Sequence, residues 1–457
     1  AGGGTYDTLN ASGTVSGKWQ NSWYSIGASH INTQGFNARQ PIPGLFGFSQ
    51  PDKDGYYNTA VNARVGHKFD NNAEIEASFM RSEGKTDYDG TLQDKTKFIN
   101  QVASLSGSMD ILDNWRSTLR LGQSFDDNEQ FAPDDSFSSN FHTQRWNATW
   151  LNELHINDNH QFILGSDYRL DEVSSSDLDT FNPGFDSYKE KSRYDVGIFG
   201  ELHSRLWDKH FINASLRWDE NEAFGDYVTG NFGWRYNSDI GISLFANFGN
   251  AFKSPTFNQL YFPIFGNPNL KPEESTSFEV GLAGDHKWLQ WEVRAYHTNI
   301  DNLIVFLPPS FNAINVDKSQ IDGIEAELGT QIMGWNAKLN ANILSPRNRT
   351  DDIRLERRAD KILSFDLSRS FGQFDLGAYV LAQGNRHEYD RDFITNQITR
   401  TQIIPGFVTV DLRTAYHFNK NWMLSAKLNN LFDKQYQTVN TYNTADRNFF
   451  ISIHYNN

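Results

Sequence analysis

Apolar and polar residues alternate one by one in segment after segment of this chain, and this pattern constrains the fold more than any other feature. In the segment 335–343, apolar residues occupy the odd positions and Asn or Lys the even ones. Successive side chains of a β-strand point to opposite faces of the sheet, so a period of two predicts strands with one apolar face. The same pattern recurs at 24–29, 59–66, 73–79, 115–121, 146–150, 194–202, 212–218, 240–249, 278–282, 408–416, 422–428 and 449–455.

Aromatic residues stand at many ends of these predicted strands, where a soluble sandwich has no need of them. Bands of aromatic side chains mark the two bilayer interfaces of transmembrane barrels. We therefore expect the apolar faces to contact lipid and the polar faces to line a water-filled lumen. The aromatic residues in question are Trp115, Trp150, Trp218, Trp335, Trp422 and Tyr455. No apolar run reaches the ~18 residues of a membrane-spanning helix.

The predicted connections fall into two classes, as in outer-membrane barrels with short turns on one side and long loops on the other. Short turns are predicted at 70–72, 157–159, 208–209, 237–238, 333–334, 372–373 and 419–421. Long loops are predicted at 32–56, 85–96, 127–140, 172–190, 253–274, 302–318, 345–357, 386–404 and 433–446. About 21 strands of roughly 10 to 14 residues are recognisable, and because bacterial barrels close with an even number we expect about 22, the first being absent.

Charge and cysteine content exclude several classes of function. The formal net charge of −15 argues against a nucleic-acid partner, because phosphate binding needs a basic surface. The chain has no cysteine, so it has neither a disulfide framework nor a thiolate metal site. No nucleophile elbow, phosphate-binding glycine loop or HExxH motif is present, and we predict that the protein is not an enzyme.

The segment 245–282 carries the most specific motif. One predicted strand ends at AFKSPTFNQLY, because Pro255 has no N–H for a sheet ladder, and NPNLKPEES precedes the next strand. These residues resemble the mid-barrel segment of TonB-dependent outer-membrane receptors, and the resemblance extends from about Thr5 to the C-terminus. It implies an all-β, antiparallel transmembrane barrel of the 22-stranded type, in the outer membrane of a Gram-negative bacterium. Lipid bilayer, lipopolysaccharide and the TonB energy-coupling complex are the implied partners.

In that family a plug domain precedes the barrel, and a segment that contacts TonB precedes the plug. We expect neither within 1–457, which would then form one barrel domain whose first residues, AGGG, are the tail of the first strand or its turn. Without a plug, a barrel of this size is expected to leave a wide polar pore, like that of a porin.

Two acidic segments follow the first two predicted strand pairs and suggest a cation site. PDKDG occupies 51–55, and KTDYDGTLQD occupies 85–94. Ca²⁺ takes six to eight oxygen ligands, mainly from carboxylates, carbonyls and water. The aspartates of both segments could supply them if the loops meet, and the alternative is that they are solvated loop acids.

Resemblance to the cobalamin (vitamin B12) receptor within this family sharpens the calcium prediction. DKDG, DYDG and QD are similar to the calcium-binding loops of that receptor. The implied ligands are Asn37, Asp52, Asp54, Tyr88 through its carbonyl, Asp89 and Asp94. Because Asn37 stands where that receptor has a further aspartate, one ion is expected to bind more weakly or not at all.

The same resemblance implies that Asn315, Arg357 and Tyr442 contact the transported cobalamin at the lumen mouth. Amide, guanidinium and phenol groups suit a large, amide-rich ligand that carries a phosphodiester. The alternative is that these segments form ordinary ion pairs of the lumen wall, such as Arg447 with Asp446 or Asp360.

Other functions of the same fold stay open from the sequence. Haem receptors carry a histidine ligand in the segment that corresponds to 252–272, and this chain has none there. A ferric-siderophore receptor, a plugless passive pore and a phage receptor are further alternatives to a cobalamin transporter.

Overall fold

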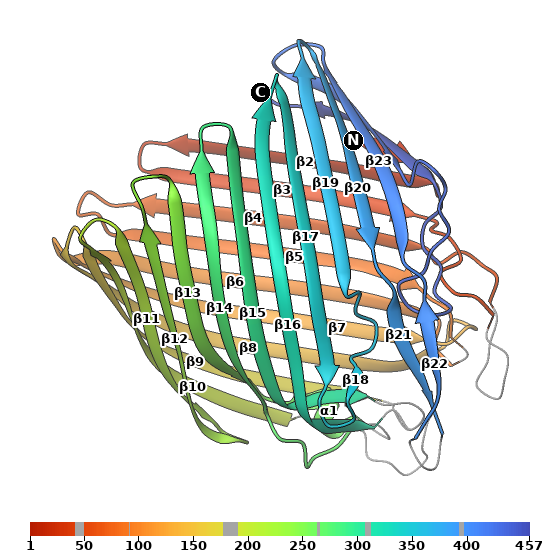
Figure 1. Cartoon of the computed structure of the whole chain (residues 1–457), viewed down its shortest axis with the longest axis horizontal. Helices are drawn as coiled ribbons and strands as arrows, with labels where there is room; N and C mark the ends of the chain where they lie inside the picture. Colours follow the sequence, from red (N-terminus) through yellow and green to blue (C-terminus); the bar gives the residue numbers. More distant parts are fainter. Residues whose placement is uncertain (42–49, 91, 177–190, 263–265, 307–311, 393–396) are drawn as a thin grey trace.

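The computed structural model is dominated by one closed antiparallel barrel (Figure 1). It contains a single α-helix, α1 (Phe257–Tyr261), in the residues that it describes. Among these residues, no helix has the length and apolar character needed to cross a membrane. The described residues are 1–41, 50–90, 92–176, 191–262, 266–306, 312–392 and 397–457. Parts of six predicted loops lie outside these ranges.

The strands vary widely in length. In chain order they are β1 (Gly2–Gly4), β2 (Thr8–Trp19), β3 (Ser22–Thr33), β4 (Tyr56–Lys68), β5 (Glu74–Asp87), β6 (Lys95–Leu112), β7 (Trp115–Phe131), β8 (Phe137–Asn157), β9 (His160–Ser176), β10 (Lys191–Leu206), β11 (His210–Asn221), β12 (Gly225–Asn237), β13 (Ile242–Lys253), β14 (Glu273–His286), β15 (Leu289–Phe306), β16 (Ala313–Ile332), β17 (Trp335–Asn348), β18 (Ile353–Arg354), β19 (Lys361–Phe371), β20 (Phe374–Gln383), β21 (Arg386–Arg391), β22 (Ile398–Ile404), β23 (Phe407–His417), β24 (Trp422–Asn429) and β25 (Asn448–Tyr455).

The barrel closes through β1, which pairs with β25 on one side and β2 on the other. The sheet has 23 strands, of which β18 extends the ladder of β17 beyond the closed circuit, so 22 strands form the wall. The prediction of a 22-strand barrel is confirmed. The first strand is represented only by Gly2–Gly4, so the prediction that AGGG is the tail of this strand is confirmed as well.

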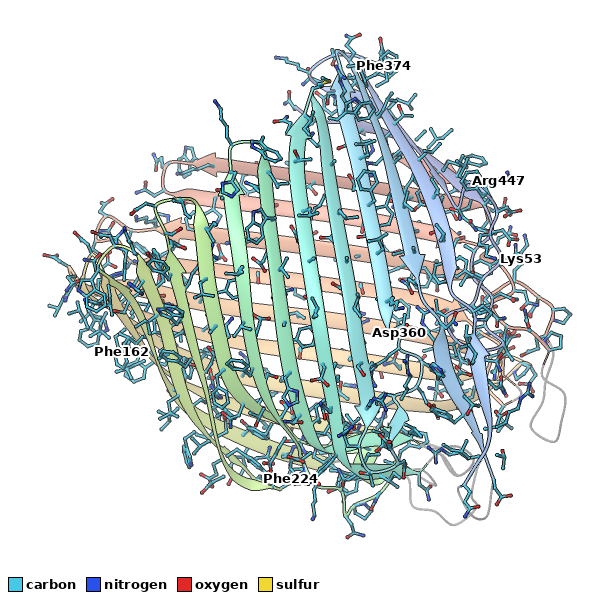
Figure 2. The ribbon with its side chains drawn as sticks, in the orientation of Figure 1. Lys53, Phe162, Phe224, Asp360, Phe374 and Arg447 are labelled. Carbon is cyan, nitrogen blue, oxygen red and sulfur yellow. The ribbon has the colours of Figure 1, made fainter. Side chains whose placement is uncertain are left out.

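The outer face is apolar, as the alternation predicted. On β14, the side chains of Phe278 and Leu282 are about half exposed, although they are strongly apolar. Each lies beside an apolar partner on β13, with Phe248 opposite Phe278 and Leu244 opposite Leu282. Apolar side chains also cover the outside elsewhere on the wall, and Phe162 and Phe374 lie near its short-turn end (Figure 2). This is a surface suited to hydrocarbon.

The inner face is polar and charged. Cross-strand ion pairs recur along it, and charged groups on a water-filled lumen need no burial. Examples are Arg217 with Asp167 at 2.6 Å, Arg413 with Asp366 at 2.6 Å and Lys338 with Glu327 at 2.7 Å.

The two ends of the barrel differ as predicted, although several loops are shorter than expected. All seven predicted short turns lie between strands at one end, toward the upper left of Figure 1. The predicted loop 127–140 is mostly strand, since β7 and β8 are connected by 132–136 alone and β8 has 21 residues. Strands of this length extend beyond the membrane. There both faces of the strand can be polar, so the apolar–polar alternation that predicts a strand is lost. The sheet of β21 and β22 lies at the opposite end, with α1.

Candidate functional site

Two chain segments that are about 400 residues apart meet on the rim that carries the long loops. The backbone N–H of Asn443 donates to the carbonyl of Ala38 at 2.8 Å, and its Nδ2 donates to the carbonyl of Asn37 at 3.0 Å. The N–H of Gln40 donates to the carbonyl of Thr441 at 2.8 Å. We call this contact between 37–40 and 441–443 the rim clamp. It fixes the first long loop against the last one.

An acidic cluster adjoins the rim clamp. Asp54 Oδ2 accepts a hydrogen bond from the N–H of Ala38 at 2.7 Å. Burial raises the pKa of the Asp54 carboxyl, and the charges of Asp52 and Asp87 add to this effect. Burial also raises the pKa of Asp89, with further contributions from Asp54 and Asp52. Like charges from two chain segments, 52–54 and 87–89, therefore crowd together, and Arg39 and Lys85 offset them only in part.

The chemistry of this cluster fits a hard cation. Both carboxylate oxygens of Asp89 are buried and accept no hydrogen bond. Buried carboxylate oxygens are costly unless they are paired or bind a metal, and an all-oxygen set suits Ca²⁺. In the described part of the chain, however, no three acidic or histidine side chains converge closely enough to hold an ion. The predicted metal ligands thus lie in one region of the rim, but their side chains do not converge on a common coordination site.

Three further predicted ligands lie around the cluster in different ways. Asn37 Oδ1 accepts from the N–H of Arg39 at 2.9 Å. The N–H of Tyr88 donates to the carbonyl of Asp94 at 2.8 Å, which holds these two residues together. The carboxylate of Asp94 lies 3.7 Å from Nζ of Lys95. Asp94 is therefore partly neutralised by a lysine.

Arg357 lies at the same rim and connects to the rim clamp through one carboxylate. Its Nε donates to Glu388 Oε1 at 2.8 Å, and the N–H of Asn440 donates to the same oxygen at 3.2 Å. The Glu388 side chain is 13% exposed and that of Arg357 is 56% exposed. Glu388 thus holds the arginine and the last loop together, while more than half of the arginine side chain stays exposed.

Tyr442 belongs to the rim clamp itself. The guanidinium carbon of Arg39 lies 5.0 Å from the centre of its ring, and these two residues also form an isolated antiparallel bridge. The ring of Tyr442 is 43% exposed. The structure therefore brings Arg357, Tyr442 and the acidic cluster to one part of the rim.

Asn315 lies elsewhere, and its amide is already occupied. Oδ1 accepts from the N–H of Lys271 at 2.9 Å, and Nδ2 donates to the carbonyls of Lys271 at 3.0 Å and Asn302 at 2.7 Å. These bonds fasten β16 to the segment before β14, and they account for an asparagine at this position without a ligand.

The predicted alternative ion pairs do not form as proposed. Asp360 pairs with Arg354 at 2.7 Å, and the carboxylate of Asp446 accepts from Gln435. The backbone N–H of Arg447, at the right edge of Figure 2, donates to Asp433.

Two important residues of this rim were not predicted as site residues, Glu388 and Asn443. They contact segments far away in the sequence, and an isolated Glu or Asn carries no local pattern, so only the closed barrel brings them to their partners. Asp87 stands in the second acidic motif, although the resemblance does not include it among the ligands. It is the last residue of β5 and belongs to the acidic cluster, and it pairs with Lys85 at 2.8 Å.

The comparison with family models agrees with this architecture. Residues 2–431 match the model described as "TonB dependent receptor-like, beta-barrel", and the chain belongs to this family. It is thus a β-barrel protein of the Gram-negative outer membrane, as predicted, in a family of transporters and receptors.

Curated relatives cover nearly all of this chain. The Vitamin B12 transporter BtuB of Photobacterium profundum is 29% identical over 468 residues, which cover 100% of this chain and 73% of the relative. Vitamin B12 transporter BtuB of Vibrio cholerae serotype O1 is 28% identical over 437 residues, covering 92% and 67% respectively.

Solved structures share the fold. The ferric enterobactin receptor PfeA of Pseudomonas aeruginosa superimposes with a TM-score of 0.85 at 18% identity, covering 98% of this chain and 77% of that one. The copper transporter OprC gives 0.82 at 18% identity, covering 99% and 79%. At identities this low, the structural similarity shows a shared fold and does not indicate which substrate this chain binds.

Proposed function

We propose that this chain is the barrel of an outer-membrane active transporter for cobalamin, which binds at the rim of the long loops. The support is twofold. Relatives named as vitamin B12 transporters align with 92% or more of the chain. The rim also gathers two groups implied to contact this substrate, Arg357 and Tyr442, around one hydrogen-bonded network. That convergence is the observation that carries the proposal.

The exposed groups of this network suit the chemistry of cobalamin. A guanidinium recognises a phosphodiester by charge-assisted hydrogen bonds, and Glu388 keeps that of Arg357 in one orientation. The half-exposed ring of Tyr442 offers an apolar face and a phenol. Holding these groups in place before binding lowers the entropy lost when the ligand is ordered.

Ca²⁺ is proposed to stabilise this arrangement. Asp52, Asp54 and Asp89 would hold it, with Asn37, Tyr88 and Asp94 completing the predicted set. The ion would add positive charge between the crowded carboxylates and ligate their oxygens. Because Asp54 binds the N–H of Ala38, ordering the cluster also orders the rim clamp and Tyr442.

Transport through the barrel is proposed to need a plug domain and TonB. The family is named for its dependence on TonB, and in our proposal the energy complex pulls on a plug to open the lumen. The polar lumen wall gives an amide-rich solute a hydrated path.

A binding assay tests the substrate. Purified protein in detergent with CaCl₂ is titrated with cyanocobalamin, haem and a ferric siderophore, and we expect cyanocobalamin alone to bind. Arg357→Ala should weaken that binding by about 10- to 100-fold, the value of a hydrogen bond to a charged group. Arg349→Ala is the matched control, since Arg349 is an exposed arginine of the same loop, 3.9 Å from Asp352.

Two results would contradict the proposal. Binding of haem or the siderophore with no affinity for cyanocobalamin would assign the barrel to another substrate. Absence of all three complexes, together with open conductance in bilayers, would favour a passive pore.

A further inference from the structure

The connection between β13 and β14 folds inward. We call its described residues, 254–262 and 266–272, the inner segment. Val173 on β9 is 1% exposed because Phe257 and Phe262 of the inner segment pack on it, together with Phe141 of β8. One end of the inner segment therefore lies against the wall formed by β8 and β9.

The contacted face of this wall is the lumen side. Val173 shares its face of β9 with Asp171, whose carboxylate pairs with Arg145 on β8 at 2.5 Å. The alternate residue Tyr168 is 45% exposed and lies beside Ala148 on the apolar outer face. The inner segment thus occupies space inside the barrel.

Arg193 of β10 fastens this segment. Its side chain is nearly buried, at 8% exposure, and Nη1 donates to the carbonyl of Pro255 at 3.0 Å. The guanidinium carbon lies 5.0 Å from the ring centre of Phe257 and 5.7 Å from that of Phe224. A desolvated cation between two aromatic rings and a carbonyl is favourable only while all three partners stay in place.

The other end of the inner segment is fixed to a different part of the wall. Leu260 and Leu270 are buried against Ile304 of β15 and Ala313 of β16. Nδ2 of Asn267 also donates to the carbonyl of Ala313 at 3.1 Å. Both apolar clusters in the described part of the chain involve this segment. It is therefore held from two sides and differs from an open surface loop.

We propose that the inner segment is a fixed constriction of the lumen at its long-loop end, fastened by Arg193, and that it confines a passing solute to the part of the wall that the segment does not contact. Its contacts reach β9 on one side and β15 and β16 on the other. Val173 and Ile304 lie near the ends of β9 and β15, and Ala313 begins β16, so all three contacts are at the end that carries the long loops. The proposal concerns the route through the barrel and does not depend on which substrate is bound.

Cysteine labelling tests this, because the chain has no cysteine of its own. Val173→Cys places a thiol beneath the inner segment, and Asn231→Cys places a control thiol at an exposed position next to the outward Phe232. We expect a water-soluble maleimide to label the second and spare the first. Adding Arg193→Ala should speed labelling at position 173 by about 10- to 100-fold, since a hydrogen bond to a charged group is lost.

Two further variants make the result specific. Phe257→Ala removes the packing contact and should also expose position 173, even if Arg193→Ala does not fold. Arg217→Ala is the matched control, because Arg217 pairs with Asp167 and Asp219 away from the inner segment, and it should leave position 173 protected. In planar bilayers, conductance should rise in Arg193→Ala and Phe257→Ala only. Equal labelling of both thiols in the parent, or protection of position 173 in both variants, would overturn the proposal.

Discussion

An arginine at position 328 tests which face of the wall contacts lipid. Leu328 on β16 is 39% exposed and lies between Trp291 of β15 and Leu339 of β17. The neighbouring residue Glu327 faces the lumen, where it pairs with Lys338. Leu328→Arg should therefore place a charge in hydrocarbon, whereas the same substitution one strand away at Asn340 should place it in water.

The expected cost follows from the depth of Leu328. A strand tilted by about 40° rises about 2.6 Å per residue along the barrel axis. Leu328 precedes Ile332, the last residue of β16, by four positions, which places it roughly 10 Å from the short-turn edge. That is close to the middle of an apolar band about 25 Å tall, where arginine costs about 2–4 kcal/mol.

Asn340→Arg is the matched control at nearly the same height. Asn340 lies opposite Glu327, so the new guanidinium gains an acidic neighbour. It loses one neutral hydrogen bond to Ser364 at 3.2 Å, which costs about 1 kcal/mol or less.

Equilibrium unfolding by urea from lipid vesicles measures both free energies. We expect the free energy of unfolding to fall by about 2–4 kcal/mol for Leu328→Arg and by less than half of that for Asn340→Arg. Equal losses, or a larger loss for Asn340→Arg, would refute the assignment of the two faces.

Three further predictions concern the rim. Glu388→Gln should weaken cyanocobalamin binding by about 10-fold without changing the urea midpoint, because it releases Arg357 and Asn440 together. Asp89→Asn should abolish Ca²⁺ uptake in calorimetry, and unchanged uptake would exclude this aspartate as a ligand. Without Ca²⁺, protection of the first long loop from proteolysis should decrease as the pH rises through the raised pKa values of Asp54 and Asp89, because their ionised forms oppose the folded loop. Ca²⁺ should restore protection at neutral pH, and a loop that resists proteolysis equally at all pH values would contradict this.

The wall of the barrel was predictable because lipid imposes a strict rule on it. Every second residue must be apolar where the strand crosses hydrocarbon, and the segment 335–343 shows this without any knowledge of its neighbours. This alternation is not required in the parts of a strand that extend beyond the membrane. The rule therefore missed the extensions of β7 and β8 into the predicted loop 127–140.

The candidate site was predictable only in part, since its contacts join distant segments. Asp52, Asp54 and Asp89 stand in short acidic motifs and were found. The motif did not show that Asp54 binds the N–H of Ala38 or that Asn443 closes the rim clamp. Asn315 was placed at the site by resemblance, yet its amide fastens backbone elsewhere.

In our proposals, specificity belongs to the rim and the inner segment and not to the wall, and the position of the buried groups gives the reason. A lumen-facing side chain on the wall lies in water and can change with little effect on folding, so it is free to vary. By contrast, one carboxylate oxygen of Glu388 accepts hydrogen bonds from both Arg357 and Asn440. Arg193 is nearly buried and donates a hydrogen bond to the inner segment. Groups with such contacts keep their orientation before any solute arrives, and preorganised groups discriminate between ligands better than mobile ones. We therefore expect a solute to be selected where polar side chains are held by their own contacts, and the 22-strand wall supplies the frame that brings those contacts together.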